Sequence, residues 1–169
     1  MTYLCSACGE THEDWPALVF AQPDPYRWLG DAEKTSFQAE CDRNTCRIAY
    51  PQQTECFIRT VLVLPVQGHD VTLEYGAWLS VSEQNYHDYR EHFNDNDHCA
   101  AYVGYLANAL PDYLQTYDVI AKAHTQGGGL RPLLELKPDP DHPLVRDFYH
   151  GISFAEAQRR VDKILGARR

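Results

Sequence analysis

Residues 57–81 read FIRTVLVLPVQGHDVTLEYGAWLSV, and this run specifies the architecture of the chain. Its first part, residues 57–64, is apolar except at two positions, as expected for a strand that is largely buried on both faces. From residue 71 to residue 81 apolar side chains recur at every second position, which is the period of a strand. A short turn that contains Gly68 joins the two runs, so the sequence predicts a β-hairpin at the core of a sheet.

Helix signals lie on both sides of this hairpin. Ser82 is a suitable N-cap for a helix that runs to about Phe93, and Asp31 for a shorter helix over about residues 32–40. Ser153 and Glu156 form a capping box at the start of a final amphipathic helix. The buried stripe of that last helix is expected to consist of Ala157, Val161, Ile164 and Leu165.

Further strands are predicted in the second half of the chain. Residues 116–124 alternate as a strand does, and residues 130–136 form another candidate, in which Pro132 favours an edge position. Residues 99–109 are apolar and fit a helix or a strand. Residues 127–129 are three glycines without the following Lys and Ser or Thr of a phosphate loop, so they indicate a turn.

Together these elements predict the α+β class, with a mostly antiparallel sheet flanked by helices and an N-terminal zinc knuckle. Residues 1–169 fit one domain, in which residues 1–50 contain the knuckle and pack on the sheet. Residues 139–143 form a rigid, proline-rich corner before the last helix.

Charge and composition limit the classes of partner. The chain has 24 acidic and 15 basic residues, a net charge of −9 that repels nucleic acid and anionic membranes. A hydrophobic content of 44% is typical of a globular protein. The sequence contains no apolar run of membrane-spanning length and no signal-peptide pattern at its start, so we expect a cytoplasmic protein.

Six cysteines in a chain without an export signal favour metal ligands or buried thiols over disulfides. Cys5 and Cys8 are spaced to bind one tetrahedral ion, and Gly9 allows the sharp turn that follows. His12 can add a nitrogen ligand. We expect Cys46 to be the fourth ligand in preference to Cys41, although Cys41 could replace either Cys46 or His12.

Such a shell of three thiolates and one imidazole has no open position for water, so the zinc would be structural. Two alternatives remain for Cys5 and Cys8. They could be ordinary cysteines, or a redox pair of the thioredoxin type, which would follow a strand and open a helix. The position of the pair at the N-terminus, before Gly9 and a proline-rich segment, favours the structural zinc.

The order of the motifs resembles a bacterial family catalogued as domain of unknown function 2199, over nearly the whole chain. The resemblance implies a bacterial source and an intracellular setting, supports the zinc set and gives no substrate. Residues 66–75 form a longer connection between the two central strands than the family leads us to expect. The motifs that carry the resemblance are Cys5-x-x-Cys8-Gly9-x-x-His12, Cys46-Arg47-Ile48, Phe57-Ile58-Arg59, residues 76–83, Gly104-Tyr105-Leu106, Leu110-Pro111-Asp112-Tyr113, Arg131-Pro132 and Asp141-His142-Pro143-Leu144.

Polar residues in these motifs raise the possibility of an enzyme. A pocket around Arg131, His142 and Glu83, with Arg59 and Asp141 nearby, could bind an anion and transfer a proton. Each residue also has a plainer structural role, and the sequence lacks a nucleophile elbow, a phosphate loop and a paired-carboxylate motif. A small-molecule or hydrolytic enzyme is therefore the alternative interpretation.

A protein-binding role fits the composition better. The chain has eleven tyrosines and three tryptophans, residue types that are enriched at interfaces because they combine apolar contact with a polar group. We expect Tyr86, Tyr89, Tyr113 and Tyr117 to be partly exposed, unless they line the core. A small acidic domain of this kind could mask a basic partner protein, as an immunity protein neutralises a toxin.

Overall fold

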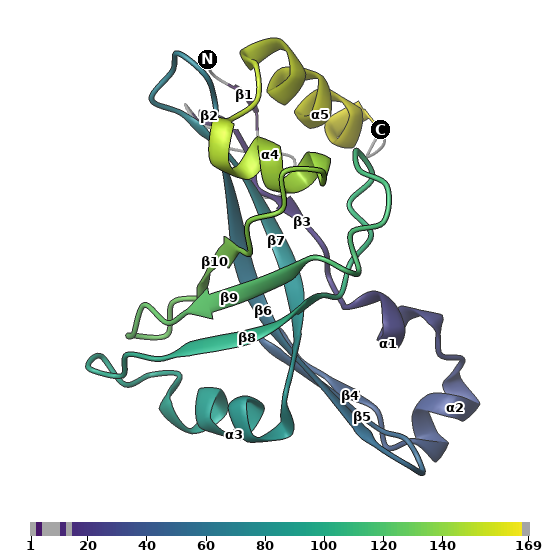
Figure 1. The fold of residues 1–169 in the computed structure, drawn as a ribbon. Helices are drawn as coiled ribbons and strands as arrows, with labels where there is room; N and C mark the ends of the chain where they lie inside the picture. Colours follow the sequence, from purple (N-terminus) through teal and green to yellow (C-terminus); the bar gives the residue numbers. More distant parts are fainter. Residues whose placement is uncertain (1–2, 5–10, 13–14, 167–169) are drawn as a thin grey trace.

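The computed structural model describes residues 3–4, 11–12 and 15–166. The described strands and helices follow one another along the chain as shown in Figure 1. They are β1 (Tyr3–Leu4), β2 (Thr11–His12), β3 (Leu18–Val19), α1 (Asp24–Trp28), α2 (Asp31–Ser36), β4 (Glu40–Cys41), β5 (Thr45–Ala49), β6 (Thr54–Pro65), β7 (Thr72–Val81), α3 (Glu83–His92), β8 (Ala101–Leu106), β9 (Ile120–His124), β10 (Leu133–Leu136), α4 (Pro143–His150) and α5 (Phe154–Gly166).

The predicted hairpin is present and dominates the fold. Strands β6 and β7 are antiparallel and paired along ten positions, from Cys56 opposite Val81 to Pro65 opposite Thr72. Ser82 caps α3 as predicted, because its hydroxyl accepts a hydrogen bond from the backbone N–H of Asn85 at 3.2 Å. The prediction of an α+β protein is confirmed.

The sheet is mostly antiparallel, as predicted, but it closes into a five-stranded barrel that the sequence patterns do not predict. Strands β6, β7, β8, β9 and β10 follow one another around the barrel, and β10 returns to pair with β6 in parallel. Strand β3 pairs with β7 in parallel, whereas β5 and β4 extend the sheet beyond β6.

The predicted edge position of residues 130–136 is wrong because β10 lies between β9 and β6. The prediction assumed that Pro132 weakens pairing, since proline has no N–H to donate. Only its carbonyl oxygen is needed here, and it accepts a hydrogen bond from the N–H of Val61 at 2.9 Å. Helix α2 also ends earlier than predicted, at Ser36, just before Gln38 takes a left-handed φ of 46°.

The main core fills the barrel and both of its ends. Interior side chains such as Leu62 and Leu79 join one cluster with Tyr86 of α3, Leu144 of α4 and Val161 of α5. Figure 1 shows α3 at one end of the barrel and α4 and α5 at the other. These three helices therefore close the apolar interior off from water.

A second, smaller core lies on the outer face of the hairpin. Phe57 and Trp78 pack there with Cys46 and Ile48 of β5, and side chains from the segments around α1 and α2 cover them. Trp78 is fully buried, and its indole N–H donates to the carbonyl oxygen of Phe20 at 3.0 Å. Residues 15–50 thus pack on the sheet. No helix in the described part of the chain is long and apolar enough to cross a bilayer.

Candidate functional site

The described residues include two of the four predicted zinc ligands, His12 and Cys46. Cys5 and Cys8 lie outside the described residues, and His12 is placed only as part of β2. Cys46 is buried in β5. Figure 1 draws β1 and β2 towards the end of the molecule that carries α4 and α5, whereas β5 lies towards the opposite end. The zinc set stays a prediction.

Cys46 has a different partner in the structure. It lies directly opposite Cys41 on the neighbouring strand β4. The interaction between the two thiols lowers the pKa of the Cys41 thiol and, together with burial, raises the pKa of the Cys46 thiol. Cys41 is therefore the member of the pair that ionises first.

The three residues of the alternative catalytic pocket occupy separate places. Glu83 lies in the first turn of α3, where its carboxylate is 3.6 Å from Arg47. His142 caps α4 through a hydrogen bond that its Nδ1 accepts from the N–H of Leu144 at 3.2 Å. Figure 1 places α3 and α4 at opposite ends of the barrel. Arg131 lines a cavity beside the barrel. Neither Glu83 nor His142 belongs to the wall of that cavity.

The four tyrosines are mostly not at the surface. Tyr86 and Tyr89 are 3% and 2% exposed, so the expectation of exposure is wrong for both, because they fill the end of the barrel. Tyr113 is half-buried and donates to Asp147 at 2.5 Å. Tyr117 is 36% exposed, and its hydroxyl donates to the buried carboxylate of Asp24 at 2.6 Å.

Arg131 and Arg43 line a cavity of about 460 Å³ beside the barrel. Asn44 and Gln126 add two amide side chains, and the rest of the wall is largely apolar, from Val61, Phe93 and Leu130. Arg131 precedes β10, and its Nε donates to Asn44 at 3.3 Å, which connects the two sides of the cavity. Ligand pockets commonly combine this size with a few polar groups on an apolar wall.

A third arginine lies next to this cavity. Arg59 is 9% exposed and shares the outer face of β6 with Val61, because alternate residues of a strand point to the same side. Its Nη1 donates to the backbone oxygen of Arg43 at 3.3 Å. The buried Nε of Arg59 has no hydrogen-bond partner in the described structure. Such an unsatisfied buried donor is uncommon.

The charges around the cavity are not balanced. No carboxylate of the described residues lies within 4.0 Å of Arg43, Arg59 or Arg131. Burial lowers the pKa of Arg59, and the nearby cations Arg131 and Arg43 lower it further. Uncompensated positive charge in a chain of net charge −9 favours a bound anion.

The connection between β9 and β10 shapes one wall of the cavity. Gly127, Gly128 and Gly129 all have positive φ values, between 60° and 76°, as the predicted glycine turn requires. A Cβ at Gly127 would lie 2.7 Å from the backbone oxygen of Asn96, so no larger residue fits there. Leu130 and Arg131, which line the cavity, follow this glycine turn directly in the sequence.

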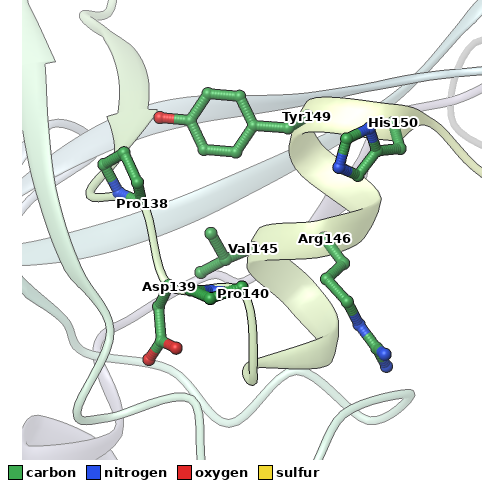
Figure 2. A pocket seen from close by; sticks show the side chains of 7 residues that line it. All are labelled: Pro138, Asp139, Pro140, Val145, Arg146, Tyr149 and His150. Atoms are coloured by element: carbon green, nitrogen blue, oxygen red, sulfur yellow. The ribbon is translucent and has the colours of Figure 1, made fainter.

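A second surface feature is a group of exposed apolar side chains on the barrel strands. Val103 and Tyr105 of β8 are each 53% exposed and Leu133 of β10 is 40% exposed, all on the outer side of the barrel. A separate hollow of about 400 Å³ lies between the segment of Pro138 and helix α4. Figure 2 shows the Tyr149 ring above this hollow, with Val145 between the helix and the proline segment.

Comparison with known protein families gives a match over most of the chain. Residues 4–152 match the family DUF2199, described as an uncharacterized protein conserved in bacteria. The chain belongs to this family. The resemblance to DUF2199 noted from its motifs is thereby confirmed. Comparison with curated proteins and with solved structures gives no match.

Sequence reasoning missed parts of the arginine cavity. The sequence predicts a site role for Arg131 but none for Arg43, Asn44 or Gln126. These residues come from two separate segments, around residues 43–44 and 126–131, that barrel closure brings together. The sequence does offer one signal, because Arg59 lies in a mostly apolar strand and neither of its immediate neighbours is acidic.

Proposed function

We propose that the chain is a binding domain for a small organic anion, a carboxylate or phosphate with an apolar part, in the cavity lined by Arg43 and Arg131. The observation that carries this proposal is the group of three arginines without a carboxylate partner among the described residues. Arginine binds carboxylate and phosphate groups through paired N–H donors, and the apolar wall suits the rest of such a ligand.

Thermal stability in the presence of simple anions tests this proposal. Sodium benzoate and sodium phosphate are compared with sodium chloride at equal ionic strength, because a ligand at 100 times its Kd stabilises a protein by about 2.7 kcal/mol. We expect stabilisation of the wild type, and its loss in Arg131→Gln and Arg43→Gln. Arg146→Gln is the matched control, since Arg146 is an exposed arginine on α4 outside the cavity. Equal losses in all three variants would contradict a specific site.

A second candidate function is protein binding, the role that the acidic and aromatic composition favours. It is supported by the exposed apolar side chains of Val103, Tyr105 and Leu133. A basic partner in the bacterial cytoplasm, such as a toxin that the chain would neutralise as an immunity protein, fits the net charge of −9. If a neighbouring gene encodes a toxin, the purified toxin should bind with steep salt dependence. Tyr105→Ala should then weaken binding more than Ala101→Ser, an exposed site on the same strand.

The structural zinc stays part of the proposal for the N-terminus, with Cys5, Cys8, His12 and Cys46 as its ligands. Metal analysis of protein purified without chelator should give one zinc per chain for the wild type and none for Cys5→Ser. Cys46→Ser and Cys41→Ser examine the fourth ligand separately. If zinc persists in Cys46→Ser, that ligand is supplied by another residue.

A further inference from the structure

Two histidines and an aspartate meet at the junction of α3 and β8. Asp88 and His92 are one turn apart on α3, and His98 follows in the connection to β8. One ligand atom from each of the three side chains lies within 4.8 Å of the other two. All three side chains are half-buried. This group lies outside the predicted zinc set and is not part of the arginine cavity.

The spacing of the ligand atoms is close to that of a metal site. The carboxylate of Asp88 lies 3.1 Å from Nε2 of His98 and 3.4 Å from Nδ1 of His92. Ligands bound to one tetrahedral ion at about 2.1 Å are about 3.4 Å apart, so these two pairs already have suitable distances. The two imidazole rings are stacked, with centroids 4.3 Å apart. Coordination requires them to turn out of this stack towards a common ion.

The surroundings provide both space and orientation. A small void of about 10 Å³ is lined by His92 and His98 together with Phe93 and Leu130, which also line the arginine cavity. A void of that size holds one water-sized occupant. The hydroxyl of Tyr102 donates to the Asp88 carboxylate at 2.6 Å, and such a second contact orients a metal-binding carboxylate.

We propose that Asp88, His92 and His98 form a binding site for a divalent transition-metal ion. Two imidazoles and one carboxylate suit zinc, nickel, cobalt or ferrous iron, and three protein ligands leave coordination positions open. The site differs in this respect from the full shell of the proposed N-terminal zinc. In the ion-free protein the same residues form a hydrogen-bonded network that joins α3 to β8.

Metal titration of a chain without the N-terminal thiolates separates the two sites. Full-length protein that carries Cys5→Ser and Cys8→Ser is titrated calorimetrically with Ni²⁺, and we expect one equivalent to bind. In this background His92→Gln and His98→Asn should each weaken binding at least about 10- to 100-fold, the loss that even outer-shell substitutions cause. Asparagine at position 98 retains an N–H donor for the Asp88 carboxylate.

His124→Asn is the matched control, because His124 is an exposed histidine on β9 that pairs with Glu135 at 2.6 Å. The affinity of the His124→Asn variant for Ni²⁺ should be unchanged. If His124→Asn weakens binding as much as the other two variants, the ion is held adventitiously by surface histidines and the proposal fails.

Histidine ring spectra of the wild-type chain give a second measurement that needs no thiol substitution. Addition of Zn²⁺ should shift the ¹⁵N resonances of His92 and His98 and leave those of His124 in place. Unshifted resonances of His92 and His98 in excess Zn²⁺ would overturn the site. Neither experiment depends on Arg43 or Arg131, so failure here leaves the anion proposal intact, and the reverse also holds.

Discussion

Arg160 is a buried cation on α5, and its side chain is only 4% exposed. It donates to Tyr113 at 2.7 Å and to Glu156 at 2.7 Å, and it also contacts Tyr75 and Asp147. Removal of this guanidinium would leave the buried hydroxyl of Tyr75 and several half-buried acceptors without this partner. We predict that Arg160→Ala lowers the free energy of unfolding by about 3–5 kcal/mol, the usual cost of breaking a buried pair. Urea denaturation followed by circular dichroism measures the loss.

The neighbouring Arg159 provides the control for this prediction. It also binds Glu156 and Asp112, but its guanidinium lies at the surface with 52% of the side chain exposed. Exposed ion pairs contribute little because water screens them. Arg159→Ala should therefore cost far less than Arg160→Ala, and similar costs for both would show that burial does not govern this network.

Glu156 makes the same network sensitive to pH. Hydrogen bonds from Arg159 and Arg160 lower the pKa of Glu156 from 4.5 to about 2. Because the folded state holds the carboxylate ionised, its contribution to stability is complete above pH 4.5 and disappears as the pH falls towards 2. We predict that the urea midpoint falls less between pH 6 and pH 3 in Glu156→Gln than in the wild type. An equal fall in both proteins would contradict the assignment.

Strands β7 and β8 approach each other closely at Gly104. It lies opposite Val81, and a Cβ at this position would be only 1.8 Å from the backbone oxygen of Ser80. The two strands approach too closely for any side chain. We predict that Gly104→Ala destabilises the protein by at least about 1–3 kcal/mol, as overpacking of a core does. Thermal unfolding measures this, with Ala101→Val, at an exposed position of the same strand, as the control.

Sequence patterns predicted elements better than they predicted how the elements pair. The hairpin of β6 and β7 follows from alternation, because each strand carries its own two-residue period. Residues 99–109 were ambiguous, and they contain β8 because Tyr102, Gly104 and Leu106 face the barrel interior. Helix α4 was missed, although Pro143 after His142 is a helix-start signal. Barrel closure depends on contacts between distant strands, which local periods do not encode.

The candidate sites also depend on contacts between distant segments, which the sequence patterns do not predict. Arg131 was chosen from a motif, yet its cavity partners Arg43 and Gln126 are 88 and 5 positions away in sequence, and pairing of β10 with β6 joins them. The Asp88 and His92 pair was readable in principle, because residues four apart lie on the same side of a helix. His98 could not be added to the pair without the turn that follows α3.

The hairpin of β6 and β7 connects the two cores of the protein. Leu62 and Leu79 of β6 and β7 point into the barrel, whereas Phe57 and Trp78 of the same strands belong to the outer cluster. Alternate residues of one strand thus serve both cores, so loss of the hairpin removes both together. This coupling favours a single cooperative unfolding transition.

Trp78 can report on the outer core alone. In a chain that carries Trp15→Phe and Trp28→Phe, it is the remaining tryptophan, and it is fully buried against Phe57 and Phe20. We predict that its fluorescence and the far-ultraviolet circular dichroism of the whole chain change at the same urea concentration. Both signals depend on β6 and β7, because those strands supply the wall that the two cores share. If the fluorescence changed first, the outer core would unfold independently, and the hairpin would have to persist without the cover of α1 and α2.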